Sequence, residues 1–221
     1  MKLITVLLCD DHAIVRAGLR QLLKAHDDLL VVGEADNGHH AVLETLLLQP
    51  DVVVMDIAMP LLNGREAMRQ IKRAVPGAKL LVLSGYDDER HVQAAIRAGA
   101  VGYVTKTAAG KDLFHAIREV HAGREYFSPA VTAVRRQERE LLAAGVASPA
   151  IKSFTMRQME ILQLIAEGFC NREVADFLVV GIKSVEKHRQ IIMDRLNLHN
   201  IASLTRYAIE QGVVEVQMTP D

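Results

Sequence analysis

Five short apolar runs, each followed by a stretch with helical periodicity, constrain the fold of this chain more than any other feature. The runs lie at residues 3–8, 30–32, 52–55, 79–83 and 101–104, and the helical stretches lie at 14–23, 38–46, 64–74, 88–98 and 111–121. Continuous apolar runs are typical of strands buried on both faces. Regular alternation of strands and helices predicts an α/β domain with a doubly wound parallel sheet, in a flavodoxin-like order with five strands and five helices.

The second half of the chain predicts helices only. Residues 130–152 carry mixed charges and then small residues, which indicates a partly helical linker. Thr155 and Gln158 then fit a capping box at the start of a helix, and a brief turn with Gly181 joins a short helix to a longer one at 182–196. Helices joined in this way are typical of a helix-turn-helix, so we expect a second, smaller all-α domain.

Bulk composition narrows the class of partner only slightly. The 221 residues have a formal net charge of -1, so a DNA-binding prediction must rest on a local surface. The two cysteines show no spacing typical of a disulfide framework or a metal site, which suits a reducing cytoplasm. The apolar start at residues 1–8 is too short for a signal peptide, and no stretch approaches the ~20 apolar residues of a membrane span. We expect a cytoplasmic protein without a membrane partner.

Polar side chains follow four of the five predicted strands. Asp10 and Asp11 follow the first strand, Asp56 the third, Ser84 the fourth and Lys106 the fifth. Because the carboxyl ends of parallel strands meet at one edge of a sheet, we expect these side chains to converge. A lone Asp after a strand is more often a helix cap than a nucleophile, but the set at matching strand ends predicts a functional site.

The predicted cluster fits phosphoryl transfer. Three converging carboxylates repel one another and raise each other's pKa, and a hard cation with oxygen ligands relieves that repulsion. Mg²⁺ (or Mn²⁺) suits this role, since it takes one or two carboxylates and then phosphoryl oxygens. Lys106 supplies a point charge and Ser84 a hydroxyl for a phosphoryl oxygen, so Asp56 is predicted to form an aspartyl phosphate.

These residues also carry a resemblance to the receiver domain of bacterial two-component response regulators. The matching motifs are Asp10-Asp-His12, Asp56-Ile-Ala-Met-Pro60 with Gly64, Leu83-Ser-Gly85 and Gly102-Tyr-Val-Thr-Lys106. The similarity covers roughly residues 2–122. It implies that a partner sensor histidine kinase phosphorylates Asp56.

The resemblance also implies a role for each residue around Asp56. Asp11 and Asp56 would bind the metal ion together with the backbone carbonyl of Ala58, while Asp10 would act mostly through water. The residues implied to sense the phosphoryl group are Ser84 and Lys106, which would contact it, and Tyr103, which would turn inward when Ser84 moves.

The second half resembles the LuxR-type DNA-binding domain joined to a receiver, as in NarL/FixJ-type regulators. The matching stretches are 164–168, 171–175, 183–189 and 192–196, within about 154–214. The resemblance implies a homodimer on double-stranded promoter DNA, reading inverted or direct half-sites about one helical turn apart or a multiple of that. The expected domains are a phosphoacceptor receiver at 1–124, a linker at 125–152 and a DNA-binding domain at 153–221.

The 182–196 helix is the predicted reading element, because a helix fits the major groove and its N-terminal half reaches base edges. The predicted phosphate contacts are Arg172, Lys183 and Ser184, and the predicted base contacts are Glu186, Lys187 and Gln190. The resemblance implies that His188 and Arg189 lie either near the DNA backbone or in the helix packing, and the sequence does not separate these two roles.

The last predicted helix, at about 201–211, carries an apolar stripe of Leu204, Tyr207 and Ala208. In the family that the chain resembles, this helix forms the dimer on DNA. Packing of the stripe within its own domain is the alternative, and the sequence favours neither.

The leading hypothesis is a transcription regulator whose dimerisation and DNA binding shift on phosphorylation, with no turnover of an external substrate. An aspartyl-phosphate hydrolase of the haloacid dehalogenase type needs a second Asp two residues after the nucleophile, where this chain has Ala58. A flavin-binding module needs a hydroxyl-rich phosphate loop after the first strand, where Asp10 and Asp11 would repel a phosphate. A regulator that works without phosphate is a further alternative, although all the phosphorylation residues are present.

Overall fold

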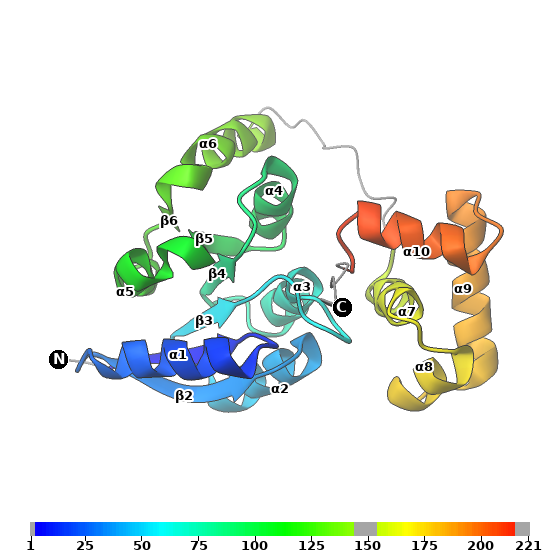
Figure 1. Ribbon diagram of the computed structural model, residues 1–221, viewed down its shortest axis with the longest axis horizontal. Helices are drawn as coiled ribbons and strands as arrows, with labels where there is room; N and C mark the ends of the chain where they lie inside the picture. Colours follow the sequence, from blue (N-terminus) through cyan, green and yellow to red (C-terminus); the bar gives the residue numbers. More distant parts are fainter. Residues whose placement is uncertain (1–2, 144–153, 215–221) are drawn as a thin grey trace, which may run out of the picture. The chain divides into compact units, whose positions relative to one another are not determined.

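A parallel sheet of six strands in the order β2-β1-β3-β4-β5-β6 organises the first half of the chain (Figure 1). The computed structural model describes residues 3–143 and 154–214, and the sheet with its helices forms the first of two compact units. The strands are β1 (Ile4–Cys9), β2 (Leu29–Ala35), β3 (Val52–Met55), β4 (Leu80–Ser84), β5 (Ala100–Thr105) and β6 (Tyr126–Phe127). The helices are α1 (Ala13–Lys24), α2 (Gly38–Leu48), α3 (Gly64–Ala74), α4 (Glu89–Arg97), α5 (Ala109–His121) and α6 (Pro129–Ala143), with a short 3₁₀ turn, η1 (Lys106–Ala108), before α5.

Both faces of the sheet are buried, which explains why the inner strands are mostly apolar. Successive strand residues point to opposite faces. On one face, Val6, Val54 and Leu83 pack in a core with side chains of α1 and α5. Leu7 and Val53 point to the other face and are fully buried as well. The predicted doubly wound parallel sheet is therefore confirmed.

The first turn of α3 lies directly against the backbone at the end of β3. The N–H of Gly64 donates to the backbone oxygen of Ile57 at 2.9 Å. A Cβ atom added to Gly64 would lie 1.9 Å from the backbone oxygen of Asp56. Because no side chain fits in that space, glycine at this position allows α3 to approach Asp56 closely.

The structure corrects the predicted number of strands from five to six. The additional strand, β6, pairs in parallel with β5 and falls inside the segment 125–152 that the sequence predicts as a linker. A strand of two residues carries no periodic signal. Arg135 of α6 forms an ion pair, at 2.6 Å, with Glu125, the residue before β6. α6 packs beside α4, so the first unit continues beyond residue 124 (Figure 1). Residues 144–152 of the predicted linker lie outside the described residues.

The second compact unit is all-α, as the sequence predicts. Within residues 154–214 its helices are α7 (Met156–Ala166), α8 (Asn171–Phe177), α9 (Ile182–Leu196) and α10 (Ile201–Glu210). The predicted capping box is present: the Gln158 N–H donates to the Thr155 hydroxyl at 3.2 Å, and the Thr155 N–H donates to the Gln158 amide oxygen at 3.0 Å. Residues 153 and 215–221 of the predicted domain lie outside the described part of the chain.

The four helices of the second unit enclose a core of their own. Leu162, Val174, Val185 and Ile192 are fully buried in it. These side chains come from α7, α8 and α9, so the core packs the short helix α8 against the long helix α9. None of the helices in the two described ranges is long and apolar enough to cross a membrane.

Gly64→Ala is expected to lower the free energy of unfolding by about 1–3 kcal/mol, because the added methyl group overpacks the contact between α3 and Asp56. The matched control is Gly18→Ala in α1, where a Cβ atom would meet nothing within 4 Å. Alanine stabilises a helix interior by about 0.5–1 kcal/mol relative to glycine, so this control should gain stability. Urea unfolding followed by circular dichroism measures both, and equal stability of the two variants would contradict the close approach.

Candidate functional site

Three of the predicted site residues meet at the carboxyl edge of the sheet through one ammonium group. Asp10 follows β1, Asp56 follows β3, and Lys106 begins η1 directly after β5. The Nζ atom of Lys106 lies 2.6 Å from Oδ2 of Asp56 and 2.8 Å from Oδ2 of Asp10. The strand order places β1, β3, β4 and β5 side by side, so residues far apart in sequence share this edge.

Asp56 is a buried carboxylate with a defined partner for each of its oxygens. It is 3% exposed, and its Oδ1 atom accepts a hydrogen bond from the N–H of Ile57 at 2.7 Å. Burial raises the pKa of the Asp56 carboxyl to about 6, although the hydrogen bond and the charge of Lys106 oppose this shift. The remaining oxygen of Asp56, Oδ2, accepts a hydrogen bond from the ammonium group of Lys106.

Side-chain atoms that could bind a metal ion lie close together around Asp56. Asp10, Asp11, His12 and Asp56 each offer one atom, and these atoms all lie within 4.8 Å of one another. The Nδ1 atom of His12 lies 2.8 Å from Oδ1 of Asp11. Three carboxylates in so small a space form an oxygen-rich donor set of the kind that Mg²⁺ prefers. His12 belongs to the predicted sequence motif, but the sequence reasoning assigns it no role.

Arg16 of α1 is a site residue that the sequence reasoning misses. Its Nη1 group donates to the backbone oxygen of Asp10 at 2.6 Å, and its Nε group donates to Glu34 of β2 at 3.4 Å. These bonds tie the backbone after β1 to the neighbouring strand. An arginine six residues after an aspartate carries no motif, so only the folded chain identifies this contact.

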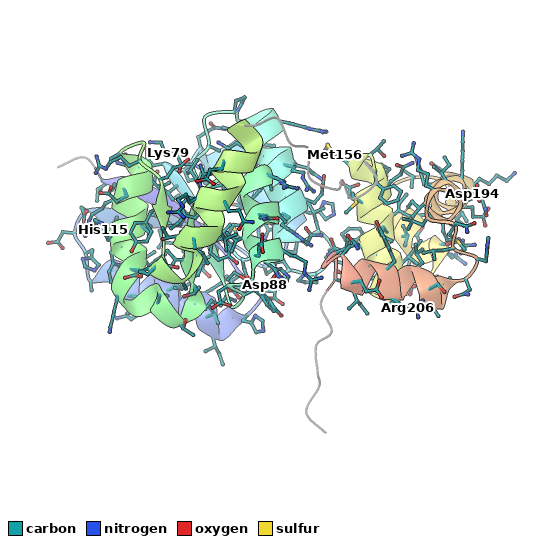
Figure 2. The ribbon with its side chains drawn as sticks, turned by 90° about the horizontal axis from the view of Figure 1, so that it is seen from above. Lys79, Asp88, His115, Met156, Asp194 and Arg206 are labelled. Atoms are coloured by element: carbon teal, nitrogen blue, oxygen red, sulfur yellow. The ribbon has the colours of Figure 1, made fainter. Side chains whose placement is uncertain are left out.

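Ser84 and Tyr103 are linked through the loop after β4. Both residues are fully buried. The N–H of Tyr86 donates to the Ser84 hydroxyl at 3.2 Å, and the Tyr103 hydroxyl donates to the backbone oxygen of Tyr86 at 2.6 Å. The ring of Tyr86 stacks on His91 of α4 with centroids 4.6 Å apart, and Asp88 caps this helix (Figure 2). Tyr103 therefore points inward and holds the β4–α4 loop.

α9 divides into a buried face and an exposed face. Val185 and Ile192 are fully buried in the core of the second unit. The predicted DNA contacts that are exposed are Arg172, Lys183, Glu186, Lys187 and Gln190, and those that are half-buried are Ser184, His188 and Arg189. The Nη1 group of Arg189 donates to the Asn171 side chain at 3.2 Å, which ties α9 to the start of α8.

The structure corrects the dimer assignment for two residues of α10. Leu204 and Ala208 are fully buried and belong to the core of their own unit. Tyr207 is half-buried and packs against the same core. The apolar stripe of α10 is needed to close the four-helix core, so Leu204 and Ala208 present no side chain to a second copy.

Comparisons with known proteins cover both units. Residues 6–118 match the family described as "Response regulator receiver domain", and residues 152–208 match the family described as "Bacterial regulatory proteins, luxR family". The chain is 36% identical over 214 residues to the oxygen regulatory protein NreC of Staphylococcus carnosus, covering 95% of this chain and 99% of that one. It is 34% identical over 212 residues to the response regulator protein VraR of Staphylococcus aureus, covering 96% and 99%.

Solved structures of response regulators share the same architecture. The RcsB response regulator of Salmonella typhimurium matches with a TM-score of 0.57 and 26% identity, over 94% of this chain and 98% of that chain. The response regulator ChrA, from a heme-sensing two-component system, matches with a TM-score of 0.53 and 34% identity, over 97% and 100%.

Lys106→Met is expected to lower the free energy of unfolding at pH 7 by about 1–3 kcal/mol, because Asp10 and Asp56 would remain buried without their shared cation. Lys106 itself is 27% exposed, so solvent screens part of the effect. Lys111→Met, at an exposed position of α5, is the matched control. Urea unfolding measures each change.

A double-mutant cycle assigns the effect to the ion pair. Lys106→Met should cost less stability when Asp56 is already replaced by Asn, because one of the two stranded charges is then absent. Strictly additive changes would exclude the coupling between Lys106 and Asp56.

Proposed function

This chain belongs to the NarL/FixJ-type two-component response regulators, a family of DNA-binding transcription regulators, and we propose that Asp56 is its phosphoacceptor. The proposed phosphoryl donor is a partner sensor histidine kinase. The observation that carries the proposal is the position of Asp56: a buried carboxylate after β3, 2.6 Å from the ammonium group of Lys106 and beside two further aspartates.

The proposed reaction transfers a phosphoryl group from a phosphohistidine to Asp56. An oxygen of the Asp56 carboxylate forms a bond to phosphorus while the P–N bond of the donor breaks, and the histidine nitrogen takes the electron pair. Lys106 can neutralise charge on the transferred group, because its Nζ atom already lies within hydrogen-bond distance of Asp56. Such transfer depends chiefly on positioning and charge neutralisation, which these residues supply.

We propose that Asp11, Asp56 and the backbone carbonyl of Ala58 bind Mg²⁺ or Mn²⁺, with Asp10 acting mostly through water. The close set of carboxylate oxygens fits such a cation, since Lys106 provides only one positive charge for three carboxylates. When bound, the cation supplies further positive charge to the phosphoryl oxygens. The residues of this chain hold the carboxylates in place, and Arg16 fixes the backbone of Asp10.

The proposed switch runs from Asp56 to α4. A phosphoryl group adds oxygen acceptors that Lys106 and the Ser84 hydroxyl can contact. Ser84 accepts a hydrogen bond from the N–H of Tyr86, and Tyr103 holds the backbone oxygen of the same residue. A new partner for Ser84 would therefore change the loop that leads into α4, and the equilibrium would shift towards the conformation that favours the phosphoryl contact.

The proposed output is DNA binding by a homodimer. Arg172, Lys183 and Ser184 would bind phosphates, while Lys187 and its neighbours on α9 would contact base edges. Arg189 is tied to Asn171 in the structure, which favours a role for it in positioning α9 against α8. Ala58 offers no acid or base next to the phosphoacceptor, in keeping with a chain that turns over no external substrate.

Acetyl phosphate with Mg²⁺ is expected to add the mass of one phosphoryl group to the wild-type chain and none to Asp56→Asn, because the amide is not a nucleophile of this kind. Asp27→Asn is the matched control, since Asp27 is exposed and precedes the start of β2, away from the carboxyl ends of the strands. Intact-mass spectrometry decides the outcome, and equal labelling of Asp56→Asn would place the phosphoacceptor elsewhere.

Mg²⁺ is expected to raise the free energy of unfolding, by about 1.4 kcal/mol when its concentration is ten times its Kd. The gain arises because the cation binds the folded carboxylate set and not the unfolded chain. Asp11→Asn should lose most of this gain, while Asp27→Asn should keep it. The measurement is the thermal unfolding midpoint with MgCl₂ against NaCl of equal ionic strength, and a shift that Asp11→Asn retains would rule out this binding site.

A further inference from the structure

One exposed side of α9 carries hydrogen-bond acceptors on successive turns. Glu186, Gln190 and Asp194 are spaced four residues apart, so their side chains follow one another along the helix. All three are exposed, and Asp194 is labelled in Figure 2. Among the described residues, Glu186 has no hydrogen-bond or ion-pair partner, so both of its carboxylate oxygens are accessible. We call these three residues the acceptor ridge.

Two lysine side chains lie beside the acceptor ridge on the surface of α9. Lys183 and Lys187 are also four residues apart and are also exposed. At 3.6 residues per turn, Lys187 is about 100° around the helix from Glu186. The N-terminal half of α9 therefore presents ammonium groups on one side and a carboxylate on the other, and a duplex in contact with it meets both.

Asp194 fixes the orientation of the Gln190 side chain. The Nε2 group of Gln190 donates to Oδ1 of Asp194 at 2.7 Å. A carboxylate only accepts hydrogen bonds, so the amide nitrogen must face Asp194 and the amide oxygen must face the other way. A free glutamine could present either group, whereas the hydrogen bond to Asp194 directs the oxygen of Gln190 to the opposite side and occupies one of its two N–H donors.

Acceptors on a DNA-reading helix have a restricted set of favourable partners. A duplex carries one negative charge per about 1.7 Å of its axis, so a carboxylate in its groove is repelled unless a donor compensates. In the major groove these donors are the exocyclic amino groups, N4 of cytosine and N6 of adenine. Guanine and thymine present acceptors at the corresponding positions, which Glu186 would disfavour.

We propose that Glu186 and Gln190 determine sequence specificity by accepting hydrogen bonds from exocyclic amino groups in the major groove, and that Asp194 is the positioning residue for Gln190. This proposal rests on the proposed DNA binding by α9. Four residues of helix rise about 6 Å and base pairs are spaced about 3.4 Å apart, so the two bases lie within about two base pairs of each other. Lys183 supplies attraction that does not depend on sequence.

Selection from a randomised duplex library tests the proposal on the full chain, phosphorylated with acetyl phosphate and Mg²⁺. Wild type is expected to select sites with cytosine or adenine fixed at one position of each half-site, and the selected base distinguishes the two amino groups. Glu186→Ala should reduce discrimination at that position about tenfold and leave the other positions unchanged. Lys183→Ala, the control, should weaken binding to selected and random duplexes by the same factor.

The base preference selected by Asp194 variants tests the positioning role of Asp194 separately. Asp194→Ala frees the amide of Gln190 to turn, so the preference at a second position should broaden to include bases that present acceptors. Asp194→Glu keeps a carboxylate four residues from Gln190 and should restore the preference. A purely structural role of Asp194 would change affinity for all duplexes without changing the base selected, and that result would overturn its assignment.

The outcomes separate this proposal from the proposed function. If Glu186→Ala binds every duplex more tightly and selects the same sites, Glu186 is only a repulsive surface charge and the specificity proposal is overturned. If phosphorylated wild type selects no sequence at all, sequence-specific DNA binding by this chain is excluded and the specificity proposal is overturned with it.

Discussion

The contact of one ammonium group with two buried carboxylates is the interaction around which the candidate site of the first unit is arranged. Lys106 reaches Asp56 and Asp10 from the end of β5, and these residues follow three different strands. The contact exists only because a parallel sheet brings the ends of β1, β3 and β5 to one edge. Glycine at position 64 lets α3 approach the backbone of Asp56 closely, and Arg16 of α1 donates a hydrogen bond to the backbone oxygen of Asp10. Sheet, helices and charges thus support one arrangement.

The sequence alone predicts most of the fold, because its signals are local. Each inner strand is a short, mostly apolar run, and each helix repeats its apolar residues at a helical period. The type and order of the elements therefore follow without knowledge of distant contacts. β6 escapes this reasoning. It has two residues and is defined by its pairing with β5, and the residue before it, Glu125, forms an ion pair with Arg135 of α6. Such a strand is defined by tertiary contacts rather than by its own pattern.

The sequence predicts some residues of the candidate site and misses others. The sequence predicts four of the site residues, because polar residues that end apolar runs are easy to recognise. These are Asp10, Asp11, Asp56 and Lys106. Arg16 is not among them, since its partner is a backbone oxygen that every residue possesses. For Leu204 and Ala208, the sequence predicts burial but does not identify the surface that buries them. An apolar stripe on a helix reports that something covers it, and only the folded chain shows that this cover is the core of its own unit.

The brevity of β6 has a consequence for self-association. An outer strand with many unpaired backbone groups is a template for another strand, and natural sheets often guard against aggregation by keeping such strands short. β6 is only two residues long, and α6 begins two residues after it ends. A second copy could therefore add little cross-strand hydrogen bonding at this border of the sheet. The short strand therefore lets this chain carry a largely apolar sheet without offering that edge for repeated addition of strands from further copies.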